Sequence, residues 1–271
     1  MKTRVIAAFA LLPLLLVVVL ACPKLITMIL LGAMAAVASW ELLAGTGIVK
    51  MPRLCLYTAL MAFWSVLWSA LQINAGWLAL GVMVFWCLLF MEVMLAKMKL
   101  PFQAIAVCFS GGLVLPFLLG SIGRIYMTEN GRALALIPFA VAFLSDSGAY
   151  FGGMLFGKHK LAPEISPKKT VEGVFGGILG AVAGLMIFFL VLQFFFGYTV
   201  NYWFVLLYAL LGSLGGVFGD LCFSVIKRQT GIKDYGNLIP GHGGVLDRFD
   251  SMMVVGPLVE VLLLLLPVAV K

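Results

Sequence analysis

One segment of this chain gathers charged residues and glycines, whereas the rest is almost entirely apolar. Of the 271 residues, 63% are hydrophobic and only 11% are charged. The segment spans residues 224–250 and lies between two long apolar stretches. Ionisable residues beside or inside a bilayer are costly and are usually functional. This segment is therefore where chemistry is expected.

The residue types in this segment suit the binding of a metal and of phosphate. Asp247 and Asp250 stand three residues apart at the expected start of the last helix, so both would lie on one side. Their hard oxygen atoms favour Mg²⁺ that arrives with a polyphosphate. Glycines allow backbone amides to approach an anion closely. The residues expected to contact phosphate here are Ser224, Lys227, Arg228, Lys233, His242, Gly243, Gly244 and Arg248.

Each of these roles has a simpler alternative. Either acid could instead be a helix N-cap. A single histidine between glycines, such as His242, is often a hydrogen-bonding turn residue.

Asp220 precedes the segment and lies inside an apolar stretch. On a helix it shares one face with Ser224, Lys227 and Arg228, which follow at four, seven and eight residues. The alternative to a functional role is a buried Asp220–Lys227 ion pair that only holds helices together. The two acids of the adjoining loop favour a shared metal site instead, so we expect Asp220 and Asp247 to bind metal, with Asp250 as a further candidate.

A second polar cluster lies upstream. Lys168 and Lys169 are expected phosphate ligands, although adjacent lysines can also serve only to orient a membrane protein. Asp146 lies in another apolar stretch that leads to this basic loop, and it is a further metal candidate. Two intramembrane acids that each lead to a basic loop indicate two sides of one site. Three other acids in apolar stretches have no polar neighbours in sequence, and we interpret them as helix-to-helix hydrogen bonders: Glu41, Glu92 and Glu260.

The elements that must position these residues are membrane-spanning helices. A mean hydropathy of +1.15 predicts an all-α, polytopic helical membrane protein. We expect about nine spans, at 5–22, 25–45, 54–72, 76–96, 101–121, 134–155, 174–197, 202–226 and 251–270. Residues 1–133 are interpreted as scaffold, and 134–271 as a catalytic region with polar loops 156–173 and 227–250. Glycines four residues apart in this second region predict close helix packing.

The distribution of Lys and Arg predicts the orientation. Fourteen of the eighteen lie on the side of the N-terminal tail and the even-numbered loops; the other four are Lys24, Arg124, Arg132 and Lys271. We therefore expect a multi-pass protein of the cell inner (plasma) membrane whose N-terminus and polar loops are cytoplasmic. Retention of the first span is favoured over its cleavage as a leader. The net charge of +7 indicates contact with anionic membrane lipids rather than with nucleic acid.

Residues 224–250 resemble the signature of the phosphatidate cytidylyltransferases, also called CDP-diacylglycerol synthases, S-x-x-K-R-x₄-K-D-x-G-x₂-I-P-x-H-G-G-x₂-D-R-x-D. The resemblance continues in residues 146–158 and 166–173, so it covers roughly the last half of the chain. It implies that CTP and phosphatidate react to give CDP-diacylglycerol and pyrophosphate. It also implies a need for Mg²⁺, with room for a second mono- or divalent cation, and a homodimer by family analogy.

The roles that fit this reaction can be assigned to residues of this chain. The expected catalytic residues are Asp220, Asp247, Lys227 and Arg228. The other basic side chains, those of Lys168, Lys169, Lys233 and Arg248, would bind the phosphates. The alternatives are a CTP-dependent polyprenol kinase and a non-enzymatic membrane lipid transporter, since a transporter also places acids in broken helices. A CDP-alcohol phosphotransferase is less consistent, because its D-G-x₂-A-R motif is absent.

Overall fold

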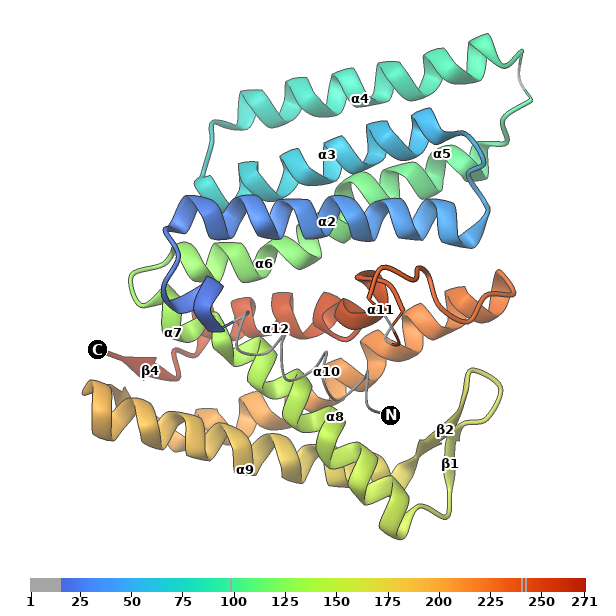
Figure 1. Cartoon of the computed structure of the whole chain (residues 1–271). Helices are drawn as coiled ribbons and strands as arrows, with labels where there is room; N and C mark the ends of the chain where they lie inside the picture. Colours follow the sequence, from blue (N-terminus) through green and yellow to red (C-terminus); the bar gives the residue numbers. More distant parts are fainter. Residues whose placement is uncertain (1–15, 98, 240, 242) are drawn as a thin grey trace. The chain divides into compact units, whose positions relative to one another are not determined.

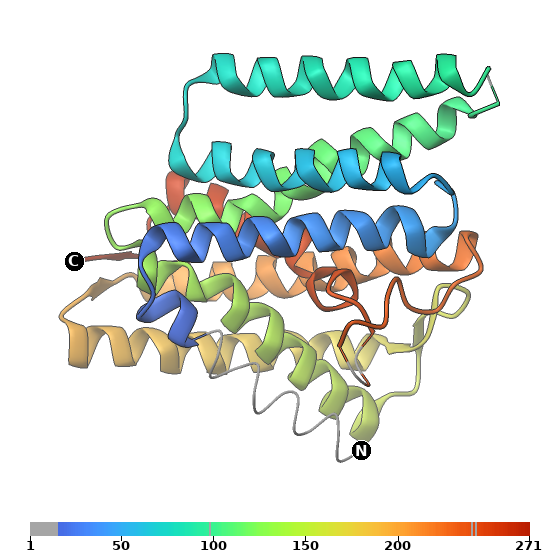
Figure 2. The same cartoon turned by 45° about the horizontal axis from the view of Figure 1, so that its top comes forward.

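The computed structural model describes residues 16–97, 99–239, 241 and 243–271, and most of these are helical (Figures 1 and 2). The helices are α2 (Lys24–Thr46), α3 (Pro52–Leu71), α4 (Ala75–Leu95), α5 (Phe102–Phe109), the π-helical η1 (Ser110–Val114), α6 (Leu115–Met127), α7 (Gly131–Leu134), α8 (Leu136–Phe156), α9 (Val171–Phe196), α10 (Tyr202–Gln229), α11 (Leu246–Phe249) and α12 (Met252–Leu265). The strands are β1 (Lys160–Ala162), β2 (Ser166–Thr170), β3 (Thr199–Val200) and β4 (Ala269–Val270).

The expected architecture of a polytopic helical membrane protein is confirmed, but the count of nine spans is not. Within the described residues, seven helical segments are long and apolar enough to cross a bilayer. They correspond to seven of the expected spans, and their ends agree within three residues except that the span expected to end at residue 121 continues to Met127. The expected span 5–22 lies largely outside the described residues. The last span is shorter than expected, because α12 has 14 residues and would reach only about 21 Å at ~1.5 Å per residue.

The chain divides into two compact units. Unit 1 comprises residues 1–128 and 227–249, and unit 2 comprises residues 129–226 and 250–271. The polar segment therefore belongs for the most part to the same unit as the first helices. The functional division expected at residue 133 stays a prediction, because compactness does not report which residues act chemically.

Helices α2, α3 and α6 pack together in unit 1. The segment from α5 to α6 is interrupted by η1, and π-turns loosen the regular backbone hydrogen bonds. Ser39 Oγ donates to the carbonyl of Gly111 at 2.6 Å, and Ser65 Oγ donates to that of Gly112 at 3.2 Å. Hydroxyls on neighbouring helices thus satisfy carbonyl groups at the irregular turn and fix α2 and α3 against it.

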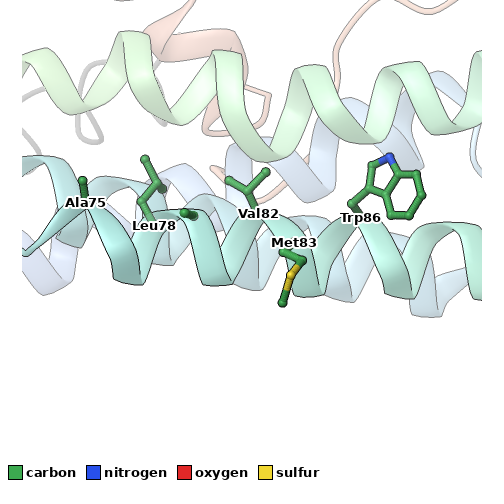
Figure 3. A pocket seen from close by; sticks show the side chains of 6 residues that line it. Ala75, Leu78, Val82, Met83 and Trp86 are labelled. Carbon is green, nitrogen blue, oxygen red and sulfur yellow. The ribbon is translucent and has the colours of Figure 1, made fainter.

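Helix α4 has a different surface character from its neighbours in unit 1. Most of its large apolar side chains are exposed, and it buries Phe85, Leu89 and Glu92. Figure 3 shows a shallow hollow along this helix that is lined by apolar side chains such as Leu78, Val82 and Trp86. An apolar surface of this extent suits contact with lipid. The hollow lacks the polar groups that a nucleotide would need.

Helices α8 and α9 lie side by side in unit 2 (Figure 1) and are joined by the antiparallel β1–β2 hairpin. Their contact is built on glycines. A Cβ atom on Gly148 would collide with the carbonyl oxygen of Gly176, and one on Gly180 would lie 2.6 Å from that of Leu144. The expected role of these glycines in close helix packing is confirmed. Their close contact fixes the base of the hairpin that contains Lys168 and Lys169.

We predict that Gly148→Ala destabilises the protein, because the added methyl group meets backbone and not a flexible side chain. Overpacking of this kind costs about 1–3 kcal/mol, which should lower the thermal unfolding midpoint in detergent by several degrees. Gly216→Ala is the matched control, since its Cβ would meet Val255 at an ordinary 3.4 Å. Equal midpoints for the two variants would contradict this account of the α8–α9 contact.

Candidate active site

Asp247 is the most fully bonded acid of the polar segment in unit 1. It lies in the short helix α11, and its side chain is only 1% exposed. Lys227 Nζ donates to its Oδ1 at 3.1 Å, while the backbone N–H groups of Tyr235 and Gly244 donate to Oδ2 at 2.8 and 3.0 Å. A buried carboxylate is stable only when its oxygens are satisfied in this way. The loop between Lys227 and Asp247 is thus folded around one negative charge.

Lys227 is buried as well, with its side chain 11% exposed. Its ammonium group lies 5.5 Å from the centre of the Tyr235 ring, within the range of a cation–π contact. The same tyrosine therefore contacts both members of the ion pair, through its amide and through its ring. Such a charge-neutral pair tolerates burial better than either group alone.

Glu41 of α2 reaches the same loop and is 7% exposed. Its carboxylate accepts the backbone N–H of Val245 at 3.0 Å and that of Leu246 at 2.8 Å. The interpretation of Glu41 as a helix-to-helix hydrogen bonder is confirmed in part, because Leu246 is the first residue of α11 whereas Val245 lies in the loop before it. For Glu92 that interpretation is confirmed, since Tyr57 of α3 donates to it at 3.2 Å.

Asp220 forms the centre of a second cluster, in unit 2. Its Oδ2 lies 2.5 Å from Lys169 Nζ at the end of the hairpin, and its Oδ1 accepts the hydroxyl of Ser224 at 3.2 Å. The alternative of an Asp220–Lys227 ion pair is not what the structure contains, because the two residues pair with Lys169 and Asp247 respectively. The Asp220 side chain is 31% exposed, so this cluster is more open than that of Asp247.

The hairpin that contains Lys169 is fixed at its base. Glu172 accepts the backbone N–H groups of Lys158 and His159, and its Oε1 lies 2.6 Å from His159 Nδ1. Thr170 caps α9 by accepting the N–H of Gly173 at 3.1 Å. These contacts were not anticipated from the sequence, where Glu172 was only part of a motif. They restrict where Lys169 can lie, which helps to hold it against Asp220.

The remaining expected site residues are mostly on the surface. The side chains of Lys168, Arg228, Lys233 and Arg248 are exposed, as solvent-accessible phosphate ligands would be. Asp146 is also exposed, on α8, while Asp250 is half-buried and its Oδ1 accepts the N–H of Ser251. His242 lies outside the described residues.

One expectation about the loop is corrected by the structure, and another stays a prediction. Asp247 and Asp250 do not begin one helix, because α11 ends at Phe249 and α12 begins at Met252. The N–H groups of residues 244–246 bond to carboxylates of this chain, and phosphate binding at Gly243 and Gly244 stays a prediction. The N–H of Gly244 donates to Asp247, and the next two N–H groups donate to Glu41.

The donor chemistry of both clusters suits a hard divalent cation. A carboxylate offers about four acceptor positions, and Asp247 uses three of them for described residues, which leaves one on Oδ1. Each Asp220 oxygen has one described partner, so each retains a free lone pair. Within the described residues, no group of three or more His, Cys, Asp or Glu side chains is placed so that it could hold a metal ion by itself. Nucleotide-associated Mg²⁺ commonly uses one or two carboxylates with phosphate oxygens and water, so these acids fit such an ion.

Comparison with known proteins agrees with the sequence signature. A curated protein of Staphylococcus epidermidis named phosphatidate cytidylyltransferase is 47% identical over 146 residues, which is 53% of this chain and 55% of that protein. Proteins of the same name from Staphylococcus haemolyticus and Staphylococcus aureus are 46% and 45% identical over 136 residues, half of this chain and 51% of each relative. The chain thus matches about half the length of these relatives. The model of the cytidylyltransferase family matches residues 2–266, and the chain belongs to this family.

Proposed function

We propose that this chain is a phosphatidate cytidylyltransferase that makes CDP-diacylglycerol and pyrophosphate from CTP and phosphatidate. The observation on which the proposal rests is that Asp247 of the signature and Asp220, which precedes the signature, are each paired with a lysine in a polar cluster. Family membership and the names of the relatives support the same reaction.

In the proposed reaction, a phosphate oxygen of phosphatidate attacks the α-phosphorus of CTP. A new P–O–P bond forms, the bond between the α-phosphorus and the bridging oxygen breaks, and pyrophosphate leaves with the electron pair on that oxygen. A phosphate monoester has a second pKa near 6 and is largely ionised at neutral pH. The nucleophile therefore needs no strong general base, and no histidine dyad is required.

The obstacle to this reaction is repulsion between two anions. Positioning and electrostatic stabilisation dominate phosphoryl-type transfers. We assign phosphate binding to Lys168, Lys169, Lys227, Arg228, Lys233 and Arg248, with Ser224, His242, Gly243 and Gly244 as further candidates. Lysines are suited to this role because an ammonium group can move from a carboxylate to a phosphate without a change of charge.

A bound Mg²⁺ would add positive charge that reduces the repulsion between the reactants. Asp220 and Asp247 are the residues that we propose to hold it, with Asp250 and Asp146 as further candidates. Room for a second mono- or divalent cation stays a prediction, as do a homodimer and contact with anionic membrane lipids.

We expect the purified protein to release pyrophosphate only when CTP, Mg²⁺ and phosphatidate are all present. A CTP-dependent polyprenol kinase would instead release CDP and require polyprenol, and a lipid transporter would consume no CTP. Separate measurement of pyrophosphate and CDP, with each acceptor and without any, distinguishes the three. Release of CDP alone, or no turnover with phosphatidate, would exclude the proposed function.

The excess of Lys and Arg on one side predicts that both polar loops face the cytoplasm. The loops 156–173 and 227–250 are separated by two expected spans, so they should emerge on the same side. Because CTP does not cross a bilayer, sealed inside-out vesicles should convert added CTP and right-side-out vesicles should not. Equal rates from permeabilised samples of both serve as the control. The reverse result would place the loops on the opposite side.

Asp247→Asn should lower kcat/KM by about 100-fold or more, because loss of the carboxylate charge removes both the partner of Lys227 and the proposed metal ligand. The matched control is Asp234→Asn, which makes the same change at an exposed acid of the same loop. Rates are compared per amount of folded protein in the membrane. Near-normal activity of Asp247→Asn would remove Asp247 from the site.

A further inference from the structure

Glu41 is separated from the polar loop by about two hundred residues of sequence, yet its carboxylate is enclosed by that loop. Its oxygens accept the N–H groups of Val245 and Leu246. Cβ atoms built on Gly236 and Gly244 would lie within 2.5 Å of Glu41 oxygens, so a larger residue at either position would displace the carboxylate. Residues on both sides of the loop, near 236 and near 244–246, therefore contact the Glu41 side chain.

Four N–H groups of the loop backbone or close to it bond to two carboxylates, those of Asp247 and Glu41. The N–H of Gly244 donates to Asp247, the next two N–H groups donate to Glu41, and Leu246 directly precedes Asp247. On the other side of the loop, the N–H of Tyr235 donates to Asp247 and the adjacent Gly236 lies against Glu41. A shift of the loop relative to Glu41 would thus also change the hydrogen bonds of Asp247.

The negative charge of Glu41 matters as well as its shape. A carboxylate offers acceptors on both oxygens, and hydrogen bonds to a charged acceptor are shorter and stronger than neutral ones. Glutamine has the same length, but its –NH₂ group would face one of the two N–H donors. Aspartate keeps the charge but is one methylene shorter, so it would not reach both donors from the same position on α2.

We infer that Glu41 is a positioning residue for Asp247: it binds the loop backbone at residues 245 and 246 and thereby orients the carboxylate that the proposed function assigns to the metal. The inference rests on that proposed function.

The test measures metal binding and backbone protection on the full-length protein in detergent. Partners of metal ligands typically change metal affinity by 10–100-fold, so the dissociation constant for Mn²⁺, followed by electron paramagnetic resonance, should rise about tenfold in Glu41→Gln and in Glu41→Asp. Amide hydrogen exchange of a peptide covering residues 243–249 should become faster in both variants. Combining Glu41→Gln with Asp247→Asn should add no further loss of Mn²⁺ affinity, because Glu41 acts through Asp247.

The matched control is Glu92→Gln, which changes another buried glutamate of unit 1 whose described partners are Tyr57 and Arg53. It should leave both the Mn²⁺ affinity and the exchange of 243–249 unchanged. Faster exchange in Glu41→Gln with unchanged Mn²⁺ affinity would reduce Glu41 to a structural residue and overturn the inference. Absence of Mn²⁺ binding in the wild-type protein would also overturn it.

Failure of the proposed function has a different signature. If the wild-type protein binds Mn²⁺ but releases no pyrophosphate from CTP and phosphatidate, the reaction is wrong and the role of Glu41 toward Asp247 is still decided by the binding data. If the wild-type protein is active and Glu41→Gln keeps the wild-type Mn²⁺ affinity, only the role of Glu41 fails.

Discussion

Two carboxylates are buried in this apolar chain, and each must be given hydrogen-bond donors. Most of the polar contacts in unit 1 supply those donors. Asp247 and Glu41 are both nearly inaccessible, and each is stabilised mainly by backbone N–H groups of one loop. An unpaired buried charge would be prohibitively costly. The loop brings its N–H groups to these two carboxylates. Glycines at positions 236 and 244 leave room for Glu41, and Lys227 is buried as the ion-pair partner of Asp247. The conformation of the polar segment is therefore stabilised mainly by hydrogen bonds and an ion pair to buried carboxylates, whereas apolar contacts hold the helices together.

The helical framework could be predicted because its cause is local. A run of about twenty apolar residues must form a helix in a bilayer, and seven of the expected spans correspond to helical segments. The expected ninth span is a shorter helix because residue 266 leaves the helical conformation just before Pro267. The π-helical interruption at Ser110–Val114 was not predicted either, and two of its carbonyls accept hydroxyls of two other helices.

Prediction of the site was less complete, and the reason lies in the kinds of partner involved. Side-chain chemistry identified Asp220, Asp247, Lys227 and Lys169 as residues of interest, and the structure joins them as two ion pairs. Glu41 was missed because its partners are backbone amides, which every residue type except proline provides. The only available signal was an acid inside an apolar span, and that signal does not identify a partner.

The two ion pairs also suggest how one chain can be stable without substrate and reactive with it. In each cluster a lysine neutralises an acid, and in the Asp247 cluster this allows both groups to remain buried. On the proposed function, the phosphates of CTP bring negative charge for the lysine, and the accompanying cation brings positive charge for the acid. In this exchange the lysine would move from the acid to the phosphates, and the accompanying cation would take its place beside the acid. The more open Asp220 cluster, whose lysine belongs to a hairpin, needs less rearrangement for this exchange than the enclosed Asp247 cluster. Fixing Asp247 through Glu41 would then confine the rearrangement there to the Lys227 side chain and leave the loop backbone in place.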